Sequence, residues 1–414
     1  MILTSCQSEY EYCQMADNVL FLGAGFSHAA GVPLMGQFVE RMWEFAAKEA
    51  TAGVKLSDAD AEIFRNAMNV FAELDTFHGR AEFDDRNIED VLSILSFNAL
   101  SGEPGSTRNL GEVNRAIGRT IELTCEVKHP GLPPDEVYTV VEDGPRGYGT
   151  MWQRLFERLS DGEELPIIIT TNYDLVLERS LFQTLISTHF DGQANTLPFD
   201  QITLRYHSRN VDALRYDVDY HQFRKWTNEM PAPVRGTVLK ASQTVSDQNL
   251  DITVLKLHGS LNFPLRKPEL PYDSSSLNPV AAVDDPSILP PIFNKGPGRN
   301  AEPVWRQALK ALREAKRLTF VGYSLPRTDI YMQYFIKAAL GPNRDLDRIA
   351  FLDPVLYEGS ERTQDMENRY RACFSPQIQK RLSFRPGTPG EYADEGKLSH
   401  LLQLLKYKPD SLLF

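Results

Sequence analysis

The sequence predicts an α/β fold in which helices cover both faces of a mainly parallel sheet, with a helical block inserted into it. Two observations carry this prediction: short apolar runs recur along the chain, and segments with helical spacing lie between several of them. Runs that are short and apolar throughout are typical of strands buried on both faces. The five runs are Asn18–Leu22, Pro166–Thr170, Ile252–Leu257, Arg317–Val321 and Arg348–Leu352.

Helices are predicted between these runs at residues 39–49, 152–159 and 302–316. The last is the clearest, because Pro303 suits the first turn of a helix and Val304, Ala308 and Leu312 would share one face. Alternation of strands and helices of this kind predicts a Rossmann-like doubly wound sheet.

Residues 50–150 interrupt the alternation with at least two amphipathic helices, and we interpret them as an inserted helical subdomain. In the first helix, Ser57 and Asp60 are spaced as in a capping box, ahead of apolar residues at helical spacing from Ile63 to Leu74. The second is predicted near residues 87–100. The sheet core would then comprise residues 1–49 and 151–414.

Three other stretches depart from the alternation. Residues 182–250 are rich in Tyr, Arg, Asp and Gln and suggest an irregular insertion. Residues 264–297 hold eight of the chain's 26 prolines, which predicts a long ordered loop or lid. The leucine-rich tail at 398–414 is interpreted either as a helix docked on its own domain or as a subunit contact.

Composition narrows the classes of partner. The chain has 414 residues and a formal net charge of −12, so we expect no direct contact with nucleic acid, which requires a basic surface. No apolar run approaches the roughly 20 residues of a membrane helix, and the N-terminus lacks the pattern of a signal peptide. The four cysteines are scattered and form no CxxC pair. We therefore expect a cytoplasmic protein with reduced thiols, no zinc ribbon and no membrane partner.

A glycine-containing loop follows the first predicted strand. In Gly23-Ala24-Gly25-Phe26-Ser27, the glycines would let the backbone approach a pyrophosphate. The third glycine of the dinucleotide fingerprint is replaced by His28, and no clear acidic residue ends a second strand about 20 positions later, which argues against a dehydrogenase. The simpler alternative is a tight turn between strand and helix.

Polar clusters also follow the other four predicted strands, at the sheet edge where ligands bind in open α/β folds. They contain Thr171, Asn172 and Asp174; His258; Gly322 and Ser324; and Asp353. The amide of Asn172 suits a hydroxyl or a water, and His258 suits a general base. Asp174 is also expected to cap a helix over residues 175–185.

Taken in order, the motifs GAGFS, AGVP, TTNYD, KLHGS and GYSLPxTD resemble the sirtuin superfamily, most closely the sirtuin-like NAD hydrolases of bacterial antiphage defence. The resemblance implies catalytic roles for Asn172 and His258 at the nicotinamide ribose. It also implies a set of residues that contact the dinucleotide: Gly23, Ala24, Gly25, Ser27, Thr171, Asp174, Gly322, Ser324 and Asp353.

The resemblance implies an enzyme that cleaves NAD to ADP-ribose and nicotinamide without a metal. It further implies control by a homo-oligomer or by a protein partner such as a HerA-type ATPase or a short Argonaute. The zinc-binding cysteines that protein deacylases carry after the HG motif are missing, and the sirtuin TQN is TTN here. Two alternatives remain: a non-catalytic sensor of NAD or ADP-ribose that signals to a partner, and an NAD-dependent protein deacylase.

Overall fold

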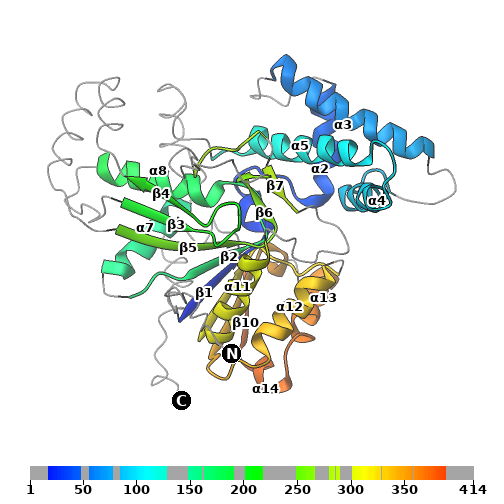
Figure 1. The fold of residues 1–414 in the computed structure, drawn as a ribbon. Helices are drawn as coiled ribbons and strands as arrows, with labels where there is room; N and C mark the ends of the chain where they lie inside the picture. The colour runs from blue at the N-terminus through cyan, green and yellow to red at the C-terminus, as the bar shows by residue number, and fades with distance from the viewer. Residues whose placement is uncertain are drawn as a thin grey trace, which may run out of the picture.

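The chain folds around an eight-stranded sheet, seen in a computed structural model (Figure 1). The structure describes residues 17–47, 56–77, 84–127, 148–160, 163–190, 201–217, 249–265, 279–284, 286–289, 301–327, 329–357 and 359–387. In spatial order, the strands are β10 (Leu382–Pro386), β9 (Arg348–Asp353), β8 (Arg317–Val321), β1 (Asn18–Leu22), β2 (Ile167–Thr170), β5 (Asn249–Lys256), β3 (Gln201–Arg205) and β4 (Ala213–Asp217).

Neighbouring strands of this sheet are parallel, apart from the antiparallel pair β3 and β4 at one edge. The predicted α/β class is therefore confirmed. The five apolar runs found in the sequence are the strands β1, β2, β5, β8 and β9, with ends that differ by at most a few residues. A separate antiparallel pair is formed by β6 (Gly259–Pro264) and β7 (Pro286–Ile288).

Helices cover both faces of the sheet, as a doubly wound fold requires. They are α1 (Ala24–His28), η1 (Met35–Gln37), α2 (Phe38–Ala46), α3 (Asp58–Phe77), α4 (Ile88–Leu100), α5 (Ser106–Thr124), α7 (Tyr148–Ser160), α8 (Val176–Phe190), α11 (Glu302–Glu314), α12 (Ile330–Leu340), η3 (Pro354–Tyr357), α13 (Glu361–Arg371) and α14 (Pro376–Gln379).

The strand residues divide between two cores because successive side chains of a strand point to opposite faces. In β1, Val19 and Phe21 join the core beneath α11, α12 and α13. Leu20 and Leu22 join the other core, which is shared with α2, α3, α4, α5, α7 and α8. Figure 1 shows these two groups of helices on opposite sides of the sheet.

The helical block predicted at 50–150 contains α3, α4 and α5, of which the sequence predicts the first two. Ser57 and Asp60 form the predicted capping box: the Asp60 N–H donates to Ser57 Oγ, and the Ser57 N–H donates to Asp60 Oδ2, each at 3.1 Å. Apolar side chains of the block, such as Phe64 and Leu92, lie in the same core as Leu20 of the central strand. The domain boundaries themselves stay a prediction.

Two expectations need correction. Residues 201–217, expected to be irregular, form the hairpin β3–β4, and β3 extends the main sheet by pairing with β5. Ile202, Leu204 and Leu214 are buried, and the apolar Ile202 and Leu204 stand two positions apart, which is the period of a strand. Within 264–297, the structure contains the short strand β7. Most of that stretch, like the tail at 398–414, lies outside the described residues.

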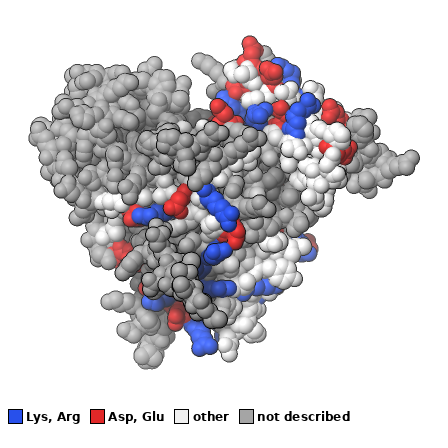
Figure 2. Space-filling view, viewed as in Figure 1, with Lys and Arg blue, Asp and Glu red and all other residues white. Residues whose placement is uncertain are grey.

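The surface of the helical block carries charges of both signs. Figure 2 shows Lys and Arg interspersed with Asp and Glu over α3 and α5. Such a mixture is typical of solvated helices. No helix in the described part of the chain is long and apolar enough to cross a membrane.

Candidate functional site

The topology brings five strand ends together at one edge of the sheet. The chain enters at β1 in the middle, extends the sheet through β2 and β5 on one side, and later through β8, β9 and β10 on the other. The strand order therefore reverses at β1, and in such sheets a crevice for ligands opens beyond the carboxyl ends of the strands at that point. The five predicted motifs follow β9, β8, β1, β2 and β5, which are consecutive neighbours.

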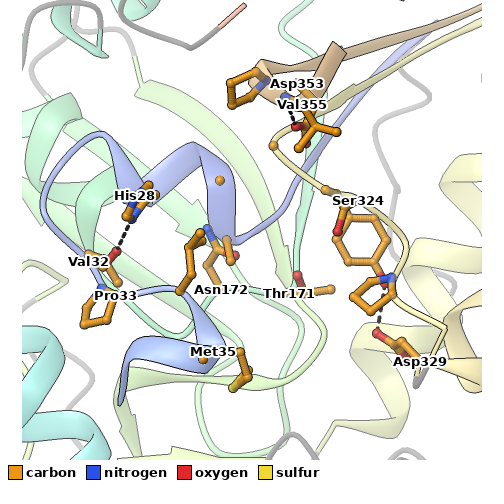
Figure 3. A pocket seen from close by; sticks show the side chains of 18 of the residues that line it. His28, Val32, Pro33, Met35, Thr171, Asn172, Ser324, Asp329, Asp353 and Val355 are labelled. Carbon is orange, nitrogen blue, oxygen red and sulfur yellow. Dashed lines mark hydrogen bonds between the residues drawn. The ribbon is translucent and has the colours of Figure 1, made fainter. Parts of the chain in front are cut away.

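A cavity of about 670 Å³ lies at this edge, within the usual size range of small-molecule sites. Figure 3 shows Asn172 and Thr171 between a wall that carries His28 and Pro33 and a wall that carries Ser324. All the predicted site residues line this cavity except Gly23 and Ser27. The structure therefore brings together residues that are more than 300 positions apart in the sequence.

Asn172 connects the cavity to the loop after β1. Its side-chain nitrogen donates to the carbonyl of Gly23 at 2.8 Å and to Ser27 Oγ at 2.9 Å. A carbonyl only accepts hydrogen bonds, so the atom that faces Gly23 must be the amide nitrogen. Both amide hydrogens are used in this way. The amide oxygen is the atom left to accept a hydrogen bond from a ligand hydroxyl or a water.

The glycines of the two loops have a structural role that precedes any ligand. The Gly25 N–H donates to the Gly322 carbonyl at 2.8 Å, so the loops after β1 and β8 touch backbone to backbone. A Cβ on Gly322 would lie 2.2 Å from the Phe26 nitrogen, and one on Gly25 would lie 2.9 Å from Gly322 Cα. The close approach that the structure shows is between the loops themselves, and the approach to a pyrophosphate stays a prediction.

His258 lies in the cavity lining directly after β5 and is 3% exposed. Its ring centroid lies 6.4 Å from that of Tyr173 and 6.1 Å from that of Trp305. The neighbouring Gly259 is required by the backbone. It has a φ of +83°, and a Cβ there would lie 2.0 Å from the Ser287 carbonyl oxygen of β7.

A buried charge network supports the loop after β2. The Lys256 ammonium contacts the Asp174 carbonyl at 2.7 Å, Ser260 Oγ at 2.8 Å and the Glu178 carboxylate at 2.9 Å. Burial raises the pKa of Asp174, against the opposing effects of the Lys256 charge and a hydrogen bond from Ser27. Asp174 Oδ1 also accepts from the Val176 N–H at 3.0 Å, at the start of α8, as the capping prediction required.

The far end of the cavity, next to β9, is built partly by residues that sequence reasoning missed. Asp353 is buried, and its Oδ1 accepts from the Val355 N–H at 2.9 Å. Arg362 and Arg369 line the cavity from α13, and Arg369 donates to the Ser324 carbonyl at 3.0 Å. No motif marks these arginines, because only the packing of α13 beside β9 brings them to the site.

The other missed lining residues come from the loop after α1 and from the helical block. His28, which replaces the third fingerprint glycine, lines the cavity, and its Nδ1 lies 3.0 Å from the Val32 carbonyl oxygen. Glu89 of α4 and Ile121 of α5 also line the cavity. Among the described residues, no group of three or more His, Cys, Asp and Glu side chains is placed to hold a metal ion.

The dimensions and donor set suit a dinucleotide. Five adjacent strands span four spacings of about 4.8 Å, or about 19 Å, which accommodates an extended dinucleotide. Polar side chains lie at both ends of that span, Asp353 at β9 and Asn172 with His258 at β2 and β5. The site therefore suits a dinucleotide in the length of this span and in the hydrogen-bonding groups at its two ends.

Two comparisons with known proteins gave a match. An 83-residue stretch is 34% identical to the malonate decarboxylase acyl carrier protein of Pseudomonas fluorescens, and covers 20% of this chain and 78% of that protein. A model of the SIR2-like domain matches residues 166–372, half of the chain's 414 residues, and this longer match includes the loops after β2, β5, β8 and β9. The chain therefore belongs to the SIR2-like domain family, whose members use NAD.

Proposed function

We propose that the protein is an NAD hydrolase that cleaves NAD to ADP-ribose and nicotinamide. One observation carries the proposal: Asn172 and His258 follow adjacent strands and line the same cavity as the two glycine-containing loops. This combination supports cleavage at the nicotinamide ribose rather than binding alone, since both residues present hydrogen-bonding groups at one end of the cavity.

For this cleavage, the protein has mainly to position the reactants and to stabilise the positive charge that develops on the ribose. Nicotinamide leaves as a neutral molecule, so no acid is required to protonate it, and the carbon left behind develops positive charge. In our proposal, the oxygen of Asn172 accepts a hydrogen bond from the attacking water and so fixes its orientation. His258 takes the proton that the water loses when it forms its bond to the anomeric carbon.

We also propose, from the resemblance to antiphage NAD hydrolases, that this activity depletes NAD in bacterial defence. Unrestricted hydrolysis would harm the host, so the activity would await a homo-oligomer or a protein partner such as a HerA-type ATPase or a short Argonaute. The partner would supply the signal, and the cavity described above would supply the chemistry.

The direct test is mass-spectrometric analysis of NAD incubated with the purified protein, alone and with the product of the neighbouring gene. We expect ADP-ribose and nicotinamide in equal amounts, with no requirement for an acylated peptide. His258→Ala should lower the rate by about 100- to 10,000-fold, the usual contribution of a general base. His207→Asn is the matched control, because His207 lies in the turn between β3 and β4, away from the cavity lining.

Asn172 needs its own control because its amide also holds the loop after β1. Asn172→Ala removes both the amide oxygen and the two hydrogen bonds to Gly23 and Ser27. Ser27→Ala removes one of those bonds but keeps the oxygen, so its loss of rate should be much smaller. Equal losses in the two variants would mean that Asn172 acts only by bracing the loop. Consumption of NAD only with an acylated peptide would identify a deacylase instead.

A further inference from the structure

The ladder of hydrogen bonds between β2 and β5 ends just before the two residues that we assign to the reaction. Thr170 and Lys256 are the last pair in register, and the Leu257 N–H donates to the Thr170 carbonyl at 2.9 Å. Asn172 and His258 each lie two residues beyond that pair. The regular pairing of the strands therefore does not fix how these two side chains lie relative to each other, and other contacts must do so.

The side chain of Lys256 makes such contacts where the ladder has ended. Its ammonium donates to the Asp174 carbonyl at 2.7 Å and to Ser260 Oγ at 2.8 Å, and it pairs with the Glu178 carboxylate at 2.9 Å. The first acceptor belongs to the loop after β2, and the second belongs to the segment that follows β5. An ammonium group has three hydrogens, so these three acceptors account for all of them.

The same two segments also touch directly beside the ammonium. The Tyr173 carbonyl accepts from the Leu261 N–H at 2.9 Å, and the Ser260 hydroxyl donates to the same carbonyl at 3.4 Å. Two consecutive carbonyls of the loop after β2, those of Tyr173 and Asp174, are therefore held from the segment after β5. Lys256 is the residue that holds both segments with one side chain.

Stability alone is a weak reason for a buried ion pair at this place. The side chains of Lys256 and Glu178 are 1% and 0% exposed, and the Tyr206 hydroxyl donates to the Glu178 carboxylate at 3.1 Å. Taking two charges out of water costs free energy, and apolar pairs of similar volume are often at least as stable. What two apolar side chains could not supply is a set of directed hydrogen bonds between the two loops.

Lys256 does not line the cavity, so any effect on the reaction must pass through its neighbours. We propose that Lys256 is a positioning residue, which holds Asn172 and His258 at the separation that the attack of water requires. The inference rests on the proposed function, because it takes these two residues to orient the water and to accept its proton. A displacement of about 1 Å in such an arrangement can lower a rate about 100-fold.

The test compares two double variants of the full-length protein, assayed for NAD hydrolysis alone and with the product of the neighbouring gene. Lys256→Met with Glu178→Gln removes the ammonium without leaving a buried carboxylate unpaired. We expect kcat to fall about 100-fold while KM for NAD stays within about threefold of the wild-type value. Arg179→Met with Glu122→Gln is the matched control, because it removes another buried cation and its carboxylate partner next to Glu178 on α8, and neither residue lines the cavity. Its kcat should stay within about threefold.

Two further measurements keep the test independent of how well the double variant folds. Ser260→Ala keeps both charges and removes one acceptor of the ammonium, so kcat should fall about tenfold, the usual effect of one hydrogen bond to a charged group. Hydrogen exchange, measured by mass spectrometry on peptides that contain Leu261, reports the contact between the two loops. The Leu261 N–H should exchange about tenfold faster in the Lys256 double variant than in the wild type, and at the wild-type rate in the control.

The outcomes separate the two proposals. If the wild type leaves NAD intact with and without its partner, the proposed function is wrong and the catalytic role of Lys256 falls with it. If the wild type hydrolyses NAD while Ser260→Ala and the Lys256 double variant keep kcat within about threefold, only the role of Lys256 is wrong. Equal losses in the Lys256 double variant and in the control would indicate general destabilisation and overturn positioning. A rise in KM at constant kcat would also overturn it, because it would indicate a role in substrate binding.

Discussion

Gly322 is the residue at which the two glycine-containing loops touch. Its φ is +62°, and any Cβ there would collide with the backbone of Gly25 and Phe26. Gly322→Ala should therefore lower the free energy of unfolding by about 2 kcal/mol or more, because both the dihedral angle and the contact are unfavourable for alanine. Urea unfolding followed by circular dichroism measures this loss.

Gly111→Ala provides the matched control. Gly111 lies inside α5, and a Cβ there would meet nothing within 4 Å. Alanine at a helical position of this kind should raise the free energy of unfolding by about 0.5–1 kcal/mol. If Gly322→Ala proved as stable as the wild type, the backbone contact between the two loops would not exist as described.

The sequence allowed the lining residues at the five strand ends to be predicted, because each follows an apolar strand in an obvious motif. The sequence could not reveal that the amide nitrogen of Asn172 donates to Gly23 and Ser27, since these residues lie nearly 150 positions away in the chain. Glu89 was unpredictable for a related reason. It sits in an ordinary acidic first turn of a helix, and only the packing of α4 beside η1 brings it to the cavity.

Among the elements, α3 depends on Asp60 for its start and for its contact with α5. Burial disfavours the charged form of Asp60, but hydrogen bonds from Arg119 and Ser57 outweigh it and lower the pKa of Asp60 below 3.8. A lowered pKa in the folded state adds stability that is present above about pH 4 and is lost as the pH falls through the folded-state value. The capping interactions of Asp60 should therefore weaken in acid.

Asp60→Asn tests this dependence. The wild type should exceed the variant in free energy of unfolding by about 1 kcal/mol at pH 7, the usual worth of a helix cap, and by much less near pH 2.5. Urea unfolding at the two pH values measures the difference. Glu62→Gln serves as the control, since Glu62 is exposed and lies two residues further along the same helix. A stability gap that did not shrink in acid would contradict ionisation of Asp60 as its source.

The elements that the sequence missed share a physical cause. The central strands are apolar on both faces, so β1, β2, β5, β8 and β9 stand out as continuous runs. The edge strand β10 is only partly buried and mixes polar and apolar residues, so it does not stand out as an apolar run. Helix α5 was missed because it contains Gly118, and a glycine weakens a helical pattern. A Cβ at Gly118 would lie 3.2 Å from Leu261, so the glycine lets α5 pack closely against β6.

For the whole molecule, the sheet joins two apolar cores that would otherwise be separate. Trp152 of α7 is buried in the core shared with the helical block, and Trp305 of α11 is buried in the core on the other face. Each strand of the centre contributes side chains to both, as Leu20 and Phe21 do in β1. Loss of one core would expose one face of the strands on which the other core also depends. This favours a single cooperative transition.

Two variants that keep Trp152 or Trp305 as the only tryptophan, with phenylalanine at the other positions, test this cooperativity. The two fluorescence unfolding curves in urea should coincide. Both variants should also carry His258→Ala, so that NAD is not consumed. NAD at 100 times its dissociation constant should then raise the free energy of unfolding of each by about 2.7 kcal/mol. Both should respond because the cavity lining draws on both cores, through Ile121 on one side and Met366 on the other. Should the Trp152 curve fall at lower urea and ignore NAD, the helical block would unfold on its own, and Glu89 would sit on an independently mobile wall of the site.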